Sequence, residues 1–245
     1  MELSDFLNDV NGVFAIQPDR TTDVKPFLGK DSTRLSYGLS NPLLRKQASI
    51  IGKKFKKTVS VTSAIDALLQ LYLETQYIEP HVLIPPLLVA LSQSDSFTDH
   101  SVWRSAIRLV NGADNWVSID MLCLEFLGRF PVYQEPFLSD VHRWKSSTSV
   151  YLQRISIVIF CRAVRKLPAA VPIALSVTAH HLLSRHNLIR KSVAWICKES
   201  SKSDKEVVYK WLQNHYSDIL WGTLNDAMSK LSSLQKTQLS KLKRG

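Results

Sequence analysis

The chain has 245 residues, of which 45% are hydrophobic and 21% charged, and its formal net charge is +10 at pH 7. This balance is typical of a folded soluble protein, and no apolar run approaches the ~20 residues that a membrane-spanning helix needs. Only 8 glycines occur, with no glycine-rich phosphate motif, which argues against nucleotide chemistry.

The apolar spacing along the chain predicts one helix after another. The expected helices are 3–16, 42–57, 62–75, 80–91, 101–110, 115–128, 136–145, 148–166, 173–184, 187–199, 204–215 and 219–232. The pair Pro85-Pro86 predicts a helix start or a break, because proline lacks the N–H that a helix interior needs. The basic tail 233–245 is expected to fray.

Strand patterns are missing from the sequence, since β-branched and polar residues never alternate over a useful length. The helices come in pairs at intervals of roughly 35–45 residues, as they do in helical solenoids. The sequence therefore predicts an all-α fold, an α-solenoid whose concave face binds the ligand. We expect one domain over residues 1–245, with about 1–34 as an N-terminal helix and polar segment.

The segment 115–130 carries an acid in an otherwise apolar helix. Asn115 suits the N-cap and Gly128 the end of this helix, and Asp120 follows Trp116 by four residues. The carboxylate and the indole therefore share one face, one turn apart. A carboxylate among apolar neighbours costs several kcal/mol unless it is paired. Asp120 is thus either half of a structural ion pair with an arginine or a functional acid.

A long interval of the chain is basic and contains no acid. Between Asp140 and Glu199 the charged residues are Arg143, Lys145, Arg154, Arg162, Arg165, Lys166, Arg185, Arg190, Lys191 and Lys198. A solvated surface normally mixes both signs, so this interval indicates a polyanionic partner, and nucleic acid is favoured over a membrane. The alternative is that the charge only raises solubility.

Two groups within the interval suit a nucleic acid backbone. Arg154 and Arg165 lie on nearly the same helical stripe, and an arginine fork matches phosphate oxygens. Lys191, Trp195 and Lys198 form a stripe of base, aromatic and base. The alternatives are surface arginines on a helix and a core tryptophan flanked by lysines.

Metal or thiol chemistry has little support. Cys123, Cys161 and Cys197 lie in apolar helical patterns and are expected to be reduced core residues. The histidines lack the spacing of a metal site. We therefore predict no metal and no cofactor.

These residues together carry a resemblance to a known family. The chain resembles the AlkD-type DNA alkylation repair glycosylases, which are built from HEAT-like repeats. The matching motifs are Trp116-x-x-x-Asp120, Trp144-x-Ser, Tyr151-Leu-Gln-Arg154, Lys191-Ser-Val-Ala-Trp195 and, less closely, the segment from Tyr37 to Arg45. The resemblance covers roughly residues 35–230.

The resemblance implies a right-handed solenoid of HEAT-like helical pairs with a concave, basic DNA-binding face. It implies a monomeric base excision repair glycosylase that releases N3- or N7-alkylated purines from double-stranded DNA, in the cytoplasm, or in the nucleus of a eukaryote. Asp120 takes the place of the catalytic carboxylate. The substrate-binding positions implied are Trp116, Trp195, Arg154 and Lys198, and those for the DNA backbone are Arg45, Arg165 and Lys191.

The sequence departs from the family pattern at two positions. Lys198 stands where the family usually has arginine, so the charge is kept without the bidentate geometry. Gln153 stands where a second arginine often occurs. Two alternatives remain open, a non-catalytic DNA-binding protein of the same fold and a helical scaffold that binds other proteins.

Overall fold

The fold was analysed in a computed structural model that describes residues 2–15, 22–23, 28 and 34–244. Packing contacts divide the chain into two compact units, Met1–Phe130 and Pro131–Gly245. The prediction of one domain over the whole chain stays a prediction.

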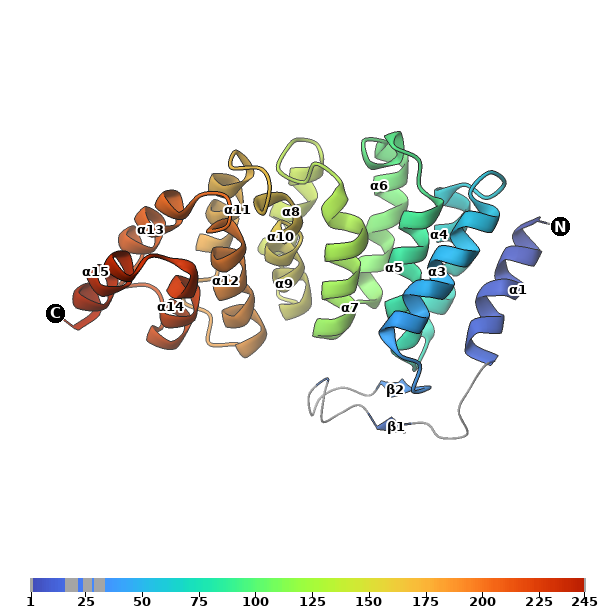
Figure 1. The fold of residues 1–245 in the computed structure, drawn as a ribbon, viewed down its shortest axis with the longest axis horizontal. Coiled ribbons are helices and arrows are strands. Elements are labelled where there is room, and N and C mark those ends of the chain that lie inside the picture. Colours follow the sequence, from blue (N-terminus) through green and yellow to red (C-terminus); the bar gives the residue numbers. More distant parts are fainter. Residues whose placement is uncertain (1, 16–21, 24–27, 29–33, 245) are drawn as a thin grey trace. The chain divides into compact units, whose positions relative to one another are not determined.

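The first unit consists mainly of α-helices that run from α1 to α7 (Figure 1). Their bounds are α1 Glu2–Ala15, α3 Asn41–Phe55, α4 Val61–Glu74, α5 Glu79–Leu91, α6 His100–Ala106 and α7 Trp116–Met121. Short 3₁₀ turns occur at Asp95–Phe97 and Ile107–Gly112. These bounds follow the predicted helices to within a few residues, except that α7 ends seven residues before the predicted end at 128.

The helices of this unit lie in two rows. In one row α3 packs along α5 and α5 packs against α7, while in the other α4 packs against α6. Gly52 permits the close approach of α3 and α5, because a Cβ at this position would collide with the side chain of Ala90. Phe6, Leu68 and Leu87 are fully buried in the core of this unit. The row of α3, α5 and α7 carries the acid and the tryptophan that the sequence singles out.

The expected break at Pro85-Pro86 was wrong, because both prolines lie inside α5. Each leaves a carbonyl of the preceding turn without its N–H partner. The helix nevertheless continues, since Leu83, Ile84 and Leu88 are fully buried around it. Tertiary packing, rather than intrinsic propensity, holds most helices in proteins.

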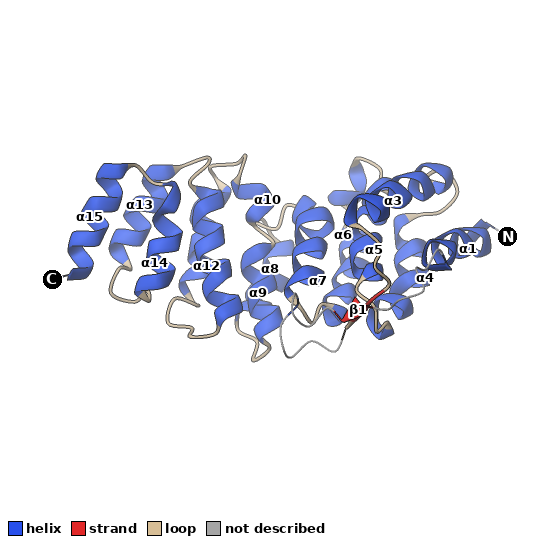
Figure 2. Cartoon of the chain, turned by 60° about the horizontal axis from the view of Figure 1, so that its bottom comes forward, coloured by secondary structure: helices blue, strands red, loops and turns tan. Residues whose placement is uncertain are grey.

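The second unit is also helical and carries the basic interval between Asp140 and Glu199. Its helices are α8 Phe137–Lys145, α9 Val150–Val158, α10 Cys161–Val164, α11 Ala170–Ala179, α12 Asn187–Ser200, α13 Lys205–Asn214, α14 Trp221–Ala227 and α15 Ser233–Arg244. A 3₁₀ turn at Met228–Lys230 follows α14. One row consists of α9, α12 and α14, with α12 packed against both neighbours (Figure 2). Behind this row, α8 packs against α9, α11 packs against α9 and α12, and α13 packs against α11 and α12.

Three helix boundaries in this unit differ from expectation. The predicted helix 148–166 divides into α9 and α10, with a turn at Ile159 and Phe160. The predicted helix 173–184 begins earlier, because Pro172 fits the first turn of α11, where its missing N–H costs nothing. The segment expected to fray forms α15 instead, and Leu239 anchors it by being fully buried.

The fold class is all-α, as predicted, and its helices stack in pairs within each unit. The short strands β1 Thr22–Asp23 and β2 Leu35–Ser36 pair antiparallel, and two residues each are too few for a sequence pattern. Cys123, Cys161 and Cys197 are buried, which confirms their assignment to the core. Among the described residues, no helix is long and apolar enough to cross a bilayer. The right-handed course and the concave basic face stay predictions.

Candidate functional site

The N-terminus of α7 is fixed by a side-chain cap. Asn115 Oδ1 accepts a hydrogen bond from the backbone N–H of Ser118 at 3.0 Å, and Asn115 Nδ2 donates to Ser118 Oγ at 2.7 Å. This confirms the N-cap that the sequence predicts. A capped first turn gives Trp116 and Asp120 defined directions, because both project from the turns that the cap begins.

The residue before the cap is held by a buried arginine. Arg34 Nε and Nη2 donate to the two oxygens of Asp114 at 3.2 and 3.0 Å, and Nη2 also points to the carbonyl of Gly112 at 3.4 Å. Such a bidentate pair fixes both partners in one plane. The loop that leads into α7 is therefore tied to the segment around β2.

A π-helical turn follows directly after the α-helical turns of α7. It spans Leu122–Phe126, and the N–H of Leu127 donates to the carbonyls of Leu122 and Cys123. A short 3₁₀ turn at Leu127–Arg129 ends the segment. The predicted helix 115–128 is thus α-helical only over its first half. Single π turns are frequent near functional sites.

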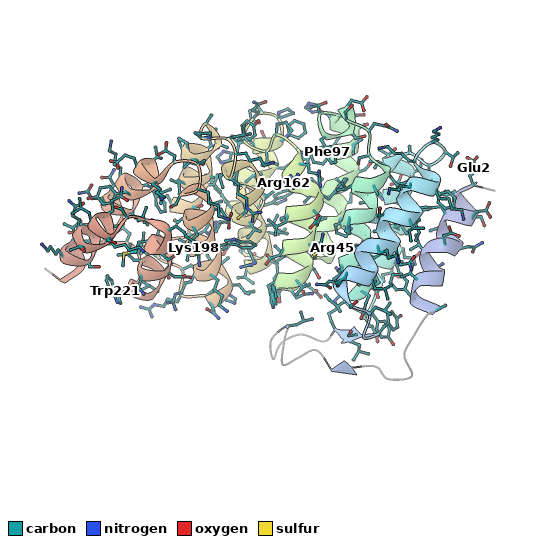
Figure 3. The ribbon with its side chains drawn as sticks, viewed as in Figure 1. Glu2, Arg45, Phe97, Arg162, Lys198 and Trp221 are labelled. Carbon is teal, nitrogen blue, oxygen red and sulfur yellow. The ribbon has the colours of Figure 1, made fainter. Side chains whose placement is uncertain are left out.

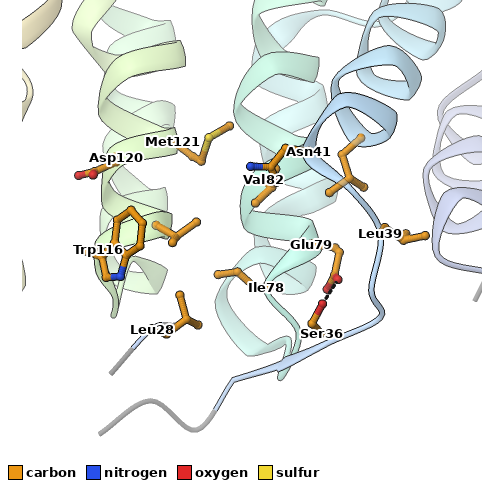
Figure 4. Close-up of a pocket in the computed structure, with 12 residues that line it drawn as sticks. Leu28, Ser36, Leu39, Asn41, Ile78, Glu79, Val82, Trp116, Asp120 and Met121 are labelled. Atoms are coloured by element: carbon orange, nitrogen blue, oxygen red, sulfur yellow. Dashed lines mark hydrogen bonds between the residues drawn. The ribbon is translucent and has the colours of Figure 1, made fainter. Parts of the chain in front are cut away.

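Trp116 and Asp120 line a cavity of about 280 Å³ within the first unit (Figure 4). Both side chains are partly exposed, and Figure 4 shows them one turn apart on α7. Apolar side chains of α3 and α5, among them Leu44 and Val82, form much of the remaining wall. The acid and the indole that the sequence pairs by spacing therefore do reach one shared space.

A second carboxylate, that of Glu79, lies in the wall of this cavity and accepts two hydrogen bonds from the protein. Glu79, 1% exposed, accepts hydrogen bonds from Ser36 Oγ at 2.5 Å and from the backbone N–H of Gly38 at 3.1 Å (Figure 4). Gly38 has φ 81°, a backbone conformation that favours glycine. Glu79 thus holds the chain from β2 against the start of α5.

Arg45, a predicted DNA backbone contact, lies on α3 and has an acidic partner (Figure 3). Its Nη2 lies 2.7 Å from Glu125 Oε1 on the π turn and 3.8 Å from Met121 Sδ. The side chain is nevertheless 46% exposed, so a phosphate could compete with this surface ion pair. Its contact with DNA stays a prediction.

In the second unit, α12 carries the predicted stripe of base, aromatic and base. Lys191 is exposed, and Trp195 and Lys198, one and two turns further on, are partly exposed. Lys198 Nζ lies 2.8 Å from Asp226 Oδ1 of α14. The indole therefore lies between two cations along the helix, and one of these cations has a surface carboxylate as its partner.

Arg154 is placed differently from a surface arginine. It is 4% exposed, and its Nη1 donates to the backbone carbonyl of Leu188 at 2.8 Å. This bond ties α9 to the first turn of α12. Arg154 therefore helps to hold the first turn of α12 in place. Its direct contact with DNA stays a prediction.

Glu199 is the residue that the sequence reasoning missed. It is 6% exposed, and its Oε1 accepts the indole N–H of Trp195 at 3.1 Å. Its Oε2 lies 2.5 Å from Arg165 Nε and 2.6 Å from Lys202 Nζ. Arg165, a predicted backbone contact, thus pairs with an acid inside the protein. Glu199 ends the acid-free interval four residues after Trp195, and this spacing could have indicated the contact.

Burial and the two cations act on Glu199 in opposite directions. Burial alone raises the pKa of a carboxyl group, but hydrogen bonds from Lys202 and Arg165 outweigh it, so the pKa of Glu199 is lowered. The group is therefore an anion at neutral pH, able to hold the indole N–H and both cations together.

The histidines provide no cluster for metal binding. Within the part of the chain that the structure describes, no group of three or more His, Cys, Asp or Glu side chains could hold a metal ion. His181 is buried beside Ser156, and burial lowers its pKa to about 4. Neither the residues around Asp120 nor those on α12 therefore form a recognisable set of metal ligands.

Comparison with known protein families identifies the family of most of the chain. The model of a family described as DNA alkylation repair enzyme matches residues 16–231. A search of curated proteins found no match.

Proposed function

Because the chain belongs to the DNA alkylation repair enzyme family, we propose that it is a DNA glycosylase that hydrolyses the N-glycosidic bond of cationic N3- or N7-alkylated purines in duplex DNA. The observation that carries the proposal is the pairing of Asp120 with Trp116. Both line one cavity, one turn apart on a helix whose start is fixed by a cap. A carboxylate beside an indole suits a sugar that becomes positively charged.

The chemistry requires little from the protein beyond this carboxylate. Alkylation makes the purine cationic, so the base leaves with the electron pair of the C1′–N bond and needs no general acid. Positive charge develops on the sugar, in an oxocarbenium-like transition state. Asp120 stabilises this charge, and a water molecule adds to C1′ and loses its proton to the carboxylate or to bulk water. Electrostatic stabilisation of this kind contributes on the order of several kcal/mol in a partly desolvated site.

The aromatic and basic residues serve binding in this proposal. Trp116 and Trp195 pack on the sugar of the modified nucleotide and exclude water. Lys191 and Lys198 contact phosphates, and the ion pair of Lys198 with Asp226 opens when a phosphate replaces the carboxylate. Exposed ion pairs contribute little to stability, so this exchange costs little. Arg154 supports the start of α12.

The remaining parts of the proposal follow from the family. The protein acts as a monomer on double-stranded DNA, without metal or cofactor. It works where the DNA is, associated with the nucleoid in the cytoplasm or in the nucleus of a eukaryote.

Incubation with a duplex that carries one N7-methylguanine tests the proposal directly. We expect the free base to appear at a rate above spontaneous depurination, and no base to be released from an unmodified duplex. Salt-dependent binding without base release would instead support a non-catalytic DNA-binding protein. If neither release nor salt-dependent binding were found, the chain would be better described as a scaffold for other proteins.

A further inference from the structure

The indole of Trp195 is held by a side chain on its own helix. Glu199 lies one turn after Trp195 on α12, and its Oε1 accepts the indole N–H at 3.1 Å. A tryptophan side chain has two rotatable bonds, and a hydrogen bond at the ring nitrogen restricts both. Trp195 is partly exposed, so packing alone surrounds it only in part. The bond to Glu199 therefore restricts the orientation of the ring.

Glu199 is in turn fixed from two sides. Arg165, which follows α10, and Lys202, which follows α12, both lie close to Oε2, at 2.5 and 2.6 Å. With Oε2 occupied by the two cations, Oε1 is left to face the indole. A carboxylate that is 6% exposed needs such partners, because an unpaired buried charge is strongly unfavourable. The carboxylate of Glu199 thus has three donors, the two cations at Oε2 and the indole N–H at Oε1.

We propose that Glu199 is a positioning residue that orients the Trp195 indole for contact with the nucleotide sugar. This inference rests on the proposed function, since it assigns the indole a task at the sugar. Glu199 itself touches neither the DNA nor the reacting atoms, and acts only through the ring.

A double-mutant cycle on Glu199→Gln and Trp195→Phe tests the functional part. Phenylalanine keeps an aromatic ring but has no N–H, so Glu199 can no longer orient the ring at position 195 in the Trp195→Phe variant. Each single variant should slow single-turnover release of N7-methylguanine by roughly tenfold, as expected for a lost hydrogen bond to a charged group. The double variant should be no slower than Trp195→Phe. If the two effects multiply instead, Glu199 acts independently of the ring and the proposal is wrong.

Loss of fold is separated from loss of positioning by the form of the time course. A variant that is partly unfolded releases less base at an unchanged rate constant, whereas a misplaced indole lowers the rate constant. Glu206→Gln is the matched control, because Glu206 is an exposed acid of α13 paired with Lys210. It should release base at the wild-type rate.

The bond can also be tested in the wild-type protein, without any activity. The indole N–H of Trp195, assigned by NMR with the Trp195→Phe variant, should exchange with solvent much more slowly than that of Trp221, which is 43% exposed. Equal exchange rates would overturn the proposal even if the protein releases base. If the exchange is slow but the protein releases no base, the hydrogen bond from Trp195 to Glu199 is confirmed and only the glycosylase function is rejected.

Discussion

His81 is a titratable side chain enclosed entirely within the first unit. It is 0% exposed, and its ring lies against that of Tyr72 with centroids 4.3 Å apart. Burial lowers its pKa to about 3, and the nearby guanidinium of Arg34 acts in the same direction. The imidazole is therefore neutral in the folded protein at every pH at which the protein is expected to work.

This burial predicts a loss of stability in acid. In the unfolded chain His81 takes up a proton below a pKa of about 6.5, whereas the folded protein takes it up only near 3. Between these values unfolding binds one extra proton, so His81 should lower the free energy of unfolding by about 1.4 kcal/mol for each pH unit of acidification. In His81→Leu this contribution disappears. Urea unfolding of both proteins at pH 7, 6 and 5 measures it, and parallel pH profiles would contradict it.

The partners of the site residues lie far away in the sequence, which limits what sequence reasoning can reach. The spacing of Trp116 and Asp120 places both on one helix face, and the structure gives them one cavity. Nothing local shows that Lys198 pairs with Asp226 or Arg165 with Glu199. Such pairs depend on which helices become neighbours. A count of basic residues therefore predicts the charge of a segment better than it predicts which cations are available to DNA.

At the scale of elements, the start of α7 is the part of the fold on which the proposed chemistry depends most. Asn115 caps the helix, and the π turn follows after Met121, so the ordinary α-helical geometry is confined to Trp116–Met121. A helix of six residues has few hydrogen bonds between its own backbone groups. The cap therefore contributes a large share of the local order of Trp116 and Asp120.

Asn115→Ala should lower both stability and activity. Loss of an N-cap costs about 1 kcal/mol, or roughly 2–4 °C in melting temperature for a protein of this size. Ser60→Ala is the matched control, since Ser60 caps α4 by accepting the N–H of Ser63. We expect similar melting temperatures for the two variants and slower base release only for Asn115→Ala. Equal release rates would show that the cap does not order the site.

Most helices could be predicted because each has a local signal, such as the cap at Asn115 or the apolar stripe of α12. The errors have a common cause. The helix through Pro85-Pro86 and the ordered tail α15 depend on burial against other elements. The π turn and the turn between α9 and α10 are changes of winding inside apolar segments, where the periodicity carries no sign of them.

For the whole molecule, the net charge of +10 contributes to DNA binding only through those cations that lie on the surface facing the DNA. Lys191 is exposed on the row formed by α9, α12 and α14. Lys210 is similarly exposed on α13, which packs behind that row, and it pairs with Glu206. The two lysines therefore form a matched pair for testing which row contacts DNA.

Lys191→Ala should weaken binding to many duplex sequences about equally. The slope of log affinity against log salt should fall by about one unit, because one phosphate contact is lost. Lys210→Ala should leave the slope as it is in the wild type. Fluorescence anisotropy at several salt concentrations measures both slopes. Equal slopes for Lys191→Ala and the wild type would exclude Lys191 from the interface.

The central claim is that the carboxylate of Asp120 stabilises the charged sugar, and the alternative is a structural ion pair. Asp120→Asn keeps the size of the side chain and removes its charge. Its matched control is Asp66→Asn, since Asp66 is an exposed acid paired with Arg108 on the surface. If Asp120 is instead half of a structural ion pair, Asp120→Asn should lower the melting temperature while the folded fraction releases base at the wild-type rate.

The most direct measurement is single-turnover release of N7-methylguanine by Asp120→Asn, with a melting curve and a binding isotherm on the same preparation. We expect base release to fall by at least about a hundredfold, in line with the loss of several kcal/mol of electrostatic stabilisation. Melting temperature and DNA affinity should stay close to those of the wild type and of Asp66→Asn. Release at the wild-type rate by a folded, DNA-bound Asp120→Asn protein would contradict the proposed mechanism.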